Sequence, residues 1–351
     1  MIDPTPPPAA PLRLMLDGAA LCDNWRALAR MSGAAVCGAA VKADGYGLGA
    51  RAVMTRLAAA GCRDFYVATW AEALAVADLG LEIAVLHGVR ADDLAVAMAA
   101  PAHLRPVLNS VDQVARWRDA GGRRCDVMID TGMNRLGLSP AEAGGGALAG
   151  LTIDTLMSHL ACADAPDDAM NARQRDAFAA MAAGVPARRR SLANSAGVAL
   201  GADYQFDLTR PGLAIYGGVP VAALADALRP VVGIAAQVLQ CRDIAAGDAV
   251  GYNATFTAAQ PMRLATLNLG YADGYWRGFS GVGRVRIGGD VRAVLGRVSM
   301  DLTIVDVTGL DAREGDWIAV DYGLPEAAAA SGMSQYELLT GLGRRFERVW
   351  C

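Results

Sequence analysis

The chain has 351 residues, of which 54% are hydrophobic and 19% are charged, and it carries a formal net charge of −4. This composition excludes a disordered chain and predicts one large domain or two of moderate size. Nucleic acid is not an expected partner because no long basic run is present, and no apolar run is long and uninterrupted enough to span a membrane.

The N-terminal residues 1–11 are rich in proline and lack both the basic and the apolar region of a secretion signal, so we expect a flexible arm. The segment Leu12–Arg30 carries a strand and a helix of its own, and we expect it to belong to the unit that follows. Up to residue 228, short apolar runs alternate with alanine- and leucine-rich segments of helical spacing. This alternation is typical of a parallel sheet.

Eight of these apolar runs are predicted to be strands, which is enough to close a (β/α)8 TIM-like barrel over residues 12–228. Predicted helices between them include Arg51–Ala60, Ala71–Leu79, Asp112–Asp119 and Asn171–Ala183. The predicted strands are Val36–Val41, Phe65–Ala68, Ile83–Leu86, Arg105–Leu108, Cys125–Ile129, Ile153–Met157, Arg190–Ala193 and Gln205–Leu208.

Residues 229–351 have a different texture, with β-branched segments separated by turn residues in place of alanine-rich helices. This pattern predicts a second, mostly β domain. One late helix, from Gln335 to about Arg345, is expected to close the chain.

The residues that follow the predicted barrel strands indicate where chemistry would occur, because parallel barrels carry their sites at the carboxyl ends of the strands. Two basic residues and two histidines occur among them, which favours an anionic ligand at the barrel mouth. These residues are Lys42, Thr69, His87, Asn109, Asp130, His159, Asn194 with Ser195, and Arg210.

Lys42 directly follows the first predicted strand and precedes a glycine-rich turn that contains Tyr46. One simple interpretation is an ordinary strand-end lysine with its ammonium group in water. Another is a dinucleotide-binding turn, because the glycines match G-x-G-x-x-A. That match is weak, since the acidic residue at about the right distance, Asp64, opens the next apolar run where a ribose-binding acid should end it.

The loops after the seventh and eighth strands are where such barrels often bind phosphate. The first reads Asn194-Ser195-Ala196-Gly197 and the second Arg210-Pro211-Gly212-Leu213. Both offer backbone N–H groups, and the first adds a hydroxyl. Separately they are ordinary turns, but together with Lys42 they favour pyridoxal 5'-phosphate, which needs a lysine for an imine, a phosphate site and a partner for its ring nitrogen.

Seven motifs, in order and across both predicted domains, resemble those of the alanine racemase family. They are VKADGYGLG, DTGMNRLG, MSHLACAD, ANSAG, RPGLAIYG, GYADGY and GRVSMD. The resemblance covers essentially the whole chain after the proline-rich arm. It implies pyridoxal-phosphate-dependent interconversion of L-alanine and D-alanine by a barrel domain and a C-terminal β domain. It also implies a homodimer whose active sites each take residues from both subunits, and D-alanine that is either supplied for peptidoglycan or degraded.

The resemblance assigns roles to individual residues. Lys42 would hold the cofactor as an imine and act as one catalytic base, and Tyr271 of the partner subunit would be the second base on the opposite face. Arg210 would face the pyridine nitrogen, and because arginine stays charged it would leave the ring unprotonated and disfavour transamination. The remaining implied residues are Tyr46, His159, Asn194, Ser195, Gly212 and Leu213 for the cofactor, and Arg135 and Met300 for the substrate.

Three positions depart from the family's common pattern. Met128 stands where many relatives have a carbamylated lysine that pairs with the arginine equivalent to Arg135, so we expect Arg135 to find another acceptor, such as a chloride ion. Ser299 replaces a cysteine. The C-terminal segment shows Arg344 and Phe346 where a phosphate-contacting tyrosine is common, so that contact is left unassigned.

Other functions remain open at this point. They include a pyridoxal-phosphate amino-acid decarboxylase, a broad-specificity amino-acid racemase on the same fold, a non-catalytic pyridoxal-phosphate carrier and a nicotinamide-dependent dehydrogenase. No metal site is expected, because the three histidines and seven cysteines show no ligand spacing. The odd, scattered cysteines favour a reducing compartment and hence a cytoplasmic protein.

Overall fold

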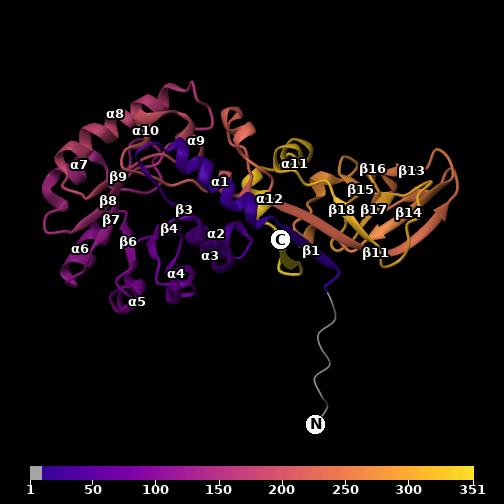
Figure 1. Ribbon diagram of the computed structural model, residues 1–351, viewed down its shortest axis with the longest axis horizontal. Coiled ribbons are helices and arrows are strands. Elements are labelled where there is room, and N and C mark those ends of the chain that lie inside the picture. Colours follow the sequence, from indigo (N-terminus) through magenta and orange to yellow (C-terminus); the bar gives the residue numbers. More distant parts are fainter. Residues whose placement is uncertain (1–9) are drawn as a thin grey trace, which may run out of the picture. The chain divides into compact units, whose positions relative to one another are not determined.

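The computed structural model describes residues 10–351, so residues 1–9 of the expected N-terminal arm lie outside the described chain. The chain divides into two compact units. Among the described residues, one consists of residues 20–229, and the other of residues 230–351 together with residues 10–19. Figure 1 labels the helices and strands of both units.

The unit of residues 20–229 is built on a parallel sheet in which consecutive strands are neighbours. Its seven strands, in order, are β3 (Ala39–Ala40), β4 (Asp64–Val67), β5 (Glu82–Val85), β6 (Leu104–Leu108), β7 (Cys125–Met128), β8 (Ile153–Met157) and β9 (Arg189–Ser191).

Two further short strands close this sheet into a barrel. Strand β10 (Leu208–Thr209) pairs in parallel with β2 (Val36–Cys37), which continues into β3 after Gly38. Single backbone hydrogen bonds, Asp207 N–H to Arg190 O and Arg210 N–H to Ala193 O, join β10 to the segment that contains β9. The predicted (β/α)8 TIM-like barrel is therefore confirmed, with its first strand interrupted at Gly38.

Helices alternate with the barrel strands and lie outside them (Figure 1). The local sequence explains where several begin: Thr69 and Glu72 form a capping box at α4, and the Ser110 hydroxyl caps α6. The helices are α1 (Gly18–Met31), α3 (Ala50–Ala60), α4 (Trp70–Leu74), α5 (Leu94–Ala99), α6 (Val111–Asp119), α7 (Pro140–Glu142), α8 (Ala169–Gly184), α9 (Ser195–Ala199) and α10 (Ala202–Gln205).

The second unit contains a mostly antiparallel sheet with strand order β14-β17-β16-β15-β18-β11-β1-β19. Because β11 pairs with β14 as well as with β18, six of these strands form a closed ring. The strands are β1 (Leu12–Leu16), β11 (Val232–Ile244), β14 (Met262–Leu267), β15 (Arg284–Ile287), β16 (Asp290–Leu295), β17 (Thr303–Asp306), β18 (Trp317–Val320) and β19 (Glu347–Trp350), with a separate hairpin of β12 (Ala249–Val250) and β13 (Phe256–Thr257).

The structure corrects the expectation that the first strand belongs to the barrel. Strand β1 pairs antiparallel with β11 and parallel with β19 in the second unit. Its sequence, LRLML, buries Leu12, Leu14 and Leu16 on one face only. That alternation suits a sheet with one buried face, whereas barrel strands such as β6 and β8 are buried on both faces.

The late helix is also shorter than predicted. Helix α12 (Gln335–Thr340) ends at Gly341, and the residues after it lead into β19, which the sequence did not predict. A second helix of this unit, α11 (Leu324–Ser331), begins with a proline in its first turn and ends at Gly332 in a left-handed conformation.

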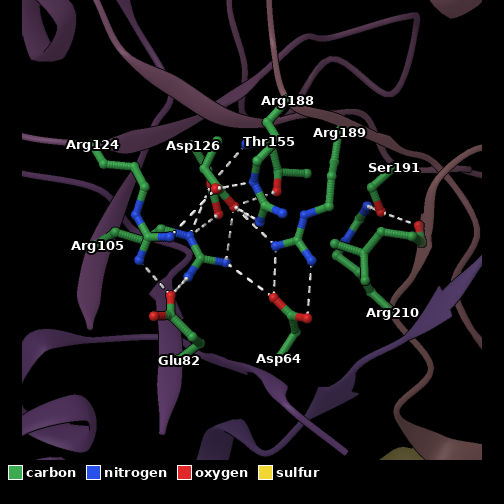
Figure 2. Close-up of polar contacts among 12 residues, drawn as sticks. Asp64, Glu82, Arg105, Arg124, Asp126, Thr155, Arg188, Arg189, Ser191 and Arg210 are labelled. Atoms are coloured by element: carbon green, nitrogen blue, oxygen red, sulfur yellow. Dashed lines mark hydrogen bonds and ion pairs between the residues drawn. The ribbon is translucent and has the colours of Figure 1, made fainter. Parts of the chain in front are cut away.

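A largely buried network of ion pairs joins residues at or near the starts of the barrel strands (Figure 2). Arg189 on β9 binds Asp64 on β4 at 2.6 Å and Asp154 on β8 at 2.9 Å, and Arg105 on β6 binds Asp126 on β7 at 3.0 Å. Strands β4 and β9 are not neighbours in the sheet, so their ion pair crosses the barrel interior. The charged side chains near the starts of these strands are therefore paired with one another.

Candidate active site

Lys42 opens a short turn, α2 (Lys42–Tyr46), directly after the first barrel strand. The turn is left-handed: φ is 53° at Ala43 and Asp44, 64° at Gly45 and 55° at Tyr46. A left-handed backbone costs roughly 1–2 kcal/mol for each residue that has a Cβ atom, so the surrounding structure must hold this turn. Strain stored next to a lysine at a barrel mouth is typical of a functional site.

The structure brings Lys42 together with three other basic side chains of the predicted site. Burial and the positive charge of Arg135 lower the pKa of Lys42, while the carboxylate of Glu72 opposes this shift. Burial, followed by the charges of Arg210, Arg135 and Lys42, lowers the pKa of His159 to about 3. His159 is therefore neutral at physiological pH, and the mouth carries the charges of one lysine and two arginines.

Arg210 is buried, with only 7% of its surface exposed. Its guanidinium donates to the Ser191 hydroxyl and to the Ser158 carbonyl, and it lies 5.9 Å from the centre of the Tyr66 ring. The two serines were not singled out from the sequence. Ser158 directly precedes His159, so one loop serves both side chains.

The two predicted phosphate-binding loops meet at Ser195. Its hydroxyl accepts hydrogen bonds from the backbone N–H groups of Gly212 at 2.8 Å and Ala214 at 3.2 Å. Asn194 caps the short helix α9 by accepting from the Gly197 N–H at 2.9 Å. Leu213 is buried and begins the turn that follows. The two loops thus meet at one place, and their binding of phosphate stays a prediction.

Tyr46 lies at the same place, next to Gly212. A Cβ atom at Gly212 would overlap the Tyr46 hydroxyl, so glycine is needed there for the tyrosine to lie where it does. The Tyr46 ring stacks on Tyr216 with 4.5 Å between ring centres, and Tyr216 donates to the carbonyl of Ala40 on β3. The turn after Lys42 and the loop after β10 therefore form one site.

These residues fit pyridoxal phosphate. Lys42 supplies a primary amine, the meeting point of Tyr46, Ser195 and Gly212 supplies donors for a phosphate, and Arg210 supplies a fixed cation. Lys42 is also the only lysine in the chain, although lysine and arginine together number 32. No other side chain can form an imine, a signal that the sequence offered and that motif analysis did not use.

Tyr271 and Met300 lie in the second unit and are next to each other there. The Tyr271 N–H donates to the carbonyl of Ser299, and the Ala272 N–H donates to the carbonyl of Met300, at 3.0 and 2.9 Å. Met300 is 55% exposed. The guanidinium of Arg277 lies 5.2 Å from the centre of the Tyr271 ring. These residues belong to the second unit, whereas the barrel-mouth residues belong to the unit of residues 20–229.

The structure also shows the surroundings of the residues that depart from the family pattern. Met128 is buried at the end of β7, and the loop that carries Arg135 folds back on it through a hydrogen bond from the Leu138 N–H to the Met128 carbonyl. Within residues 10–351, Arg135 is exposed and has no hydrogen-bond or ion-pair partner. Phe346 is buried in the second unit.

Two further findings concern the described residues alone. No helix among them is both long and apolar enough to cross a membrane. Over the same part of the chain, no three His, Cys, Asp or Glu side chains gather closely enough to hold a metal ion.

A parallel barrel whose basic mouth presents a single lysine defines a class of protein, the barrel enzymes that use pyridoxal phosphate. Comparison with known families identifies the member of that class. Residues 16–220 match the model of the alanine racemase N-terminal domain, and residues 231–350 match that of the C-terminal domain. The chain therefore belongs to the alanine racemase family.

Similar proteins extend over nearly the whole chain. An alanine racemase of Acidiphilium cryptum is 45% identical over 96% of this chain and 98% of its own length. One of Rhodospirillum rubrum is 43% identical over 95% and 94%. The solved alanine racemase of Bartonella henselae, which contains covalently bound pyridoxal phosphate, is 35% identical, covers 98% of this chain and 100% of its own, and superimposes with a TM-score of 0.89.

Proposed function

We propose that this chain is an alanine racemase that interconverts L-alanine and D-alanine with pyridoxal phosphate covalently attached to Lys42. The observation that carries the proposal is the only lysine of the chain, placed at the mouth of the barrel beside Arg135, His159 and Arg210. When bound, the cofactor withdraws electrons from the α-carbon of the amino acid and so makes its proton removable.

Two side chains, on opposite faces of the bound substrate, carry the proton. Lys42 accepts or returns it at Nζ on one face, and its lowered pKa, caused by burial and by Arg135, increases the fraction of the free amine that acts as a base. The Tyr271 hydroxyl serves the other face. Racemisation is symmetric in this sense, because each residue removes the proton in one direction and delivers it in the other.

The remaining residues bind and orient. Arg210, held by Ser158 and Ser191, keeps a positive charge where the ring nitrogen would lie, and it has no acceptor for a proton. Neutral His159 lies beside it without adding charge. The phosphate contacts are Tyr46, Asn194, Ser195, Gly212 and Leu213, and the substrate carboxylate contacts are Arg135 and the backbone of Met300.

The active form is a homodimer in which Tyr271 of the partner subunit completes each site. Tyr271 and Met300 lie together on the second unit, and Met300 is largely exposed, as expected for residues that function against another chain. The location is cytoplasmic, in keeping with seven scattered cysteines that are all free.

The test uses the covalent attachment. Purified protein should be yellow, and borohydride reduction should fix the cofactor on a single peptide, the one that contains Lys42. Lys42→Ala should be colourless. Incubation of the wild type with L-alanine should produce D-alanine by chiral analysis, and production of carbon dioxide or a keto acid in its place would contradict the proposal.

A further inference from the structure

The left-handed turn that carries Lys42 needs an anchor. Right-handed backbone would be favoured at Ala43 and Asp44, yet both have φ of 53°. Within the turn, the Gly47 N–H donates to the Ala43 carbonyl, and the Asp44 carboxylate accepts from the Ala50 N–H at 2.8 Å. These bonds close the turn on itself and on α3, and Tyr46 packs on Tyr216, but none of these contacts joins Ala43 to β4.

Glu72 makes that link. One oxygen of its carboxylate accepts from the Ala43 N–H at 2.7 Å. The other oxygen accepts from the N–H groups of Ala68 at 2.6 Å and Thr69 at 3.3 Å, at the end of β4. A single carboxylate thus ties the residue after Lys42 to the neighbouring barrel strand.

This use of both oxygens goes beyond helix capping. Two other capping boxes in the chain, Ser139 with Glu142 and Ser334 with Glu337, use one carboxylate oxygen for the serine alone. In the box of Thr69 and Glu72, the second oxygen is directed at the lysine turn. Capping of α4 therefore needs only one carboxylate oxygen of Glu72, and the other oxygen accepts the hydrogen bond from Ala43 in the turn.

Charged and titratable groups also lie around Lys42 at this place. The groups that face Lys42 are Arg135 from the loop after β7, His159 from the end of β8 and Glu72 from α4. His159 is neutral, so Glu72 is the negative group set against the positive charge of Arg135.

We propose that Glu72 is a positioning residue for Lys42: its carboxylate holds the left-handed turn against the end of β4 through the N–H groups of Ala43 and Ala68. This inference rests on the proposed role of Lys42, and it deepens that role by naming what fixes the amine in place.

The first measurement follows the turn in the holoenzyme. In Glu72→Ala, amide hydrogen exchange in residues 43–49 should accelerate by about tenfold or more, as expected when a charge-assisted hydrogen bond to the backbone is lost. Glu142→Ala, which removes the matched capping box of α7 in the same barrel, should leave exchange in this segment unchanged. Equal exchange in both variants would overturn the positioning role.

The second measurement follows the amine without the cofactor. Because Lys42 is the only lysine, reductive methylation with 13C-formaldehyde gives one lysine signal in the NMR spectrum of the full chain, apart from the N-terminal amine. Glu72→Gln removes the negative charge and keeps the size, so the titration of this signal should move to lower pH. Glu142→Gln should not move it.

The outcomes separate this inference from the proposed function. If borohydride fails to attach the cofactor to Lys42, the proposed function fails, whatever the Glu72 variants do. If attachment occurs but exchange in the turn does not respond to Glu72, only the positioning role is overturned, whatever the titration shows. Should Glu72→Ala fail to fold, exchange in Glu72→Gln decides the matter, because a single amide oxygen cannot serve both the turn and β4.

Discussion

Tyr271 and Lys42 should differ in what their loss does, because we propose that each serves one face of the substrate. In Tyr271→Phe, washout of the α-deuteron from L-alanine should fall by at least about a hundredfold, the usual contribution of a general base. Washout from D-alanine, for which Lys42 is the base, should fall less. The two labelled enantiomers are followed separately by mass spectrometry.

The control for this experiment is Tyr336→Phe, which changes an exposed tyrosine on α12 of the same unit. It should leave both washout rates unchanged. Small and equal losses for the two enantiomers in Tyr271→Phe would remove Tyr271 from its role as a base.

Arg135 poses a second residue-scale question, because Met128 cannot supply the carboxylate that a carbamylated lysine would. Activity should not respond to bicarbonate, whereas Met128→Lys should introduce a bicarbonate response. Wild-type activity in chloride-free acetate buffer should rise when chloride is added at constant ionic strength, since a small anion can pair with the exposed guanidinium. A flat chloride response would leave water or a carboxylate as the partner of Arg135.

Among the elements, the contact between the turn at Tyr46 and the loop at Gly212 is the most constrained. In Gly212→Ala the new methyl group overlaps the Tyr46 hydroxyl, so the tyrosine must move. Affinity for pyridoxal phosphate, measured by equilibrium dialysis, should weaken by about tenfold, the effect of losing one good hydrogen bond to a charged group.

A double-mutant cycle tests that explanation. Tyr46→Phe removes the overlapping oxygen, so Gly212→Ala should have a smaller effect in the Tyr46→Phe background than in the wild type. Additive effects would mean that the methyl group acts on something other than Tyr46.

The same elements show what the sequence could predict. Strand–helix alternation gave the barrel, and the residue after each strand end led to Lys42, His159, Asn194, Ser195 and Arg210, because parallel strands gather their carboxyl ends at one edge. Ser158 and Ser191 escaped prediction, since nothing in a serine's local sequence indicates that it will receive a buried guanidinium.

Two elements could not be predicted for a different reason. The place of β1 depends on pairing with β11 and β19, which are more than two hundred residues away, although its one-sided alternation of leucines was visible. The left-handed turn at Ala43 and Asp44 runs against local preference and exists because Glu72 and the neighbouring strands hold it.

At the scale of the whole molecule, Asp154 in the buried ion network makes the free energy of unfolding depend on pH. Burial alone would raise the pKa of Asp154, but hydrogen bonds and charges from Arg188, Arg105 and Arg189 outweigh it and hold the pKa well below its ordinary range. A carboxylate of this kind stabilises the fold above its unfolded pKa, and the contribution is lost as the pH falls toward the folded value.

Asp154→Asn should therefore lower the free energy of unfolding at pH 7 by about 1–3 kcal/mol, because it takes one carboxylate from buried Arg105 and Arg189, which keep Asp126 and Asp64 as partners. The difference from the wild type should begin to shrink below about pH 4, because Asp154 of the unfolded chain binds a proton there while the folded carboxylate stays ionised. Urea titrations at pH 7 and pH 3.5 measure both values. Asp243→Asn, which breaks an exposed pair with Arg263, should change little at either pH.

The single lysine has a consequence for proteolysis. An endoproteinase that cuts only after lysine has one possible cleavage point in the entire chain, the bond between Lys42 and Ala43. Proteases bind their substrates as extended strands, so the left-handed turn must open before it can be cut, and a lysine that carries the cofactor is not recognised. The rate at which two fragments appear on a gel thus reports how often the turn at Lys42 opens in the cofactor-free protein, without any label or engineered site.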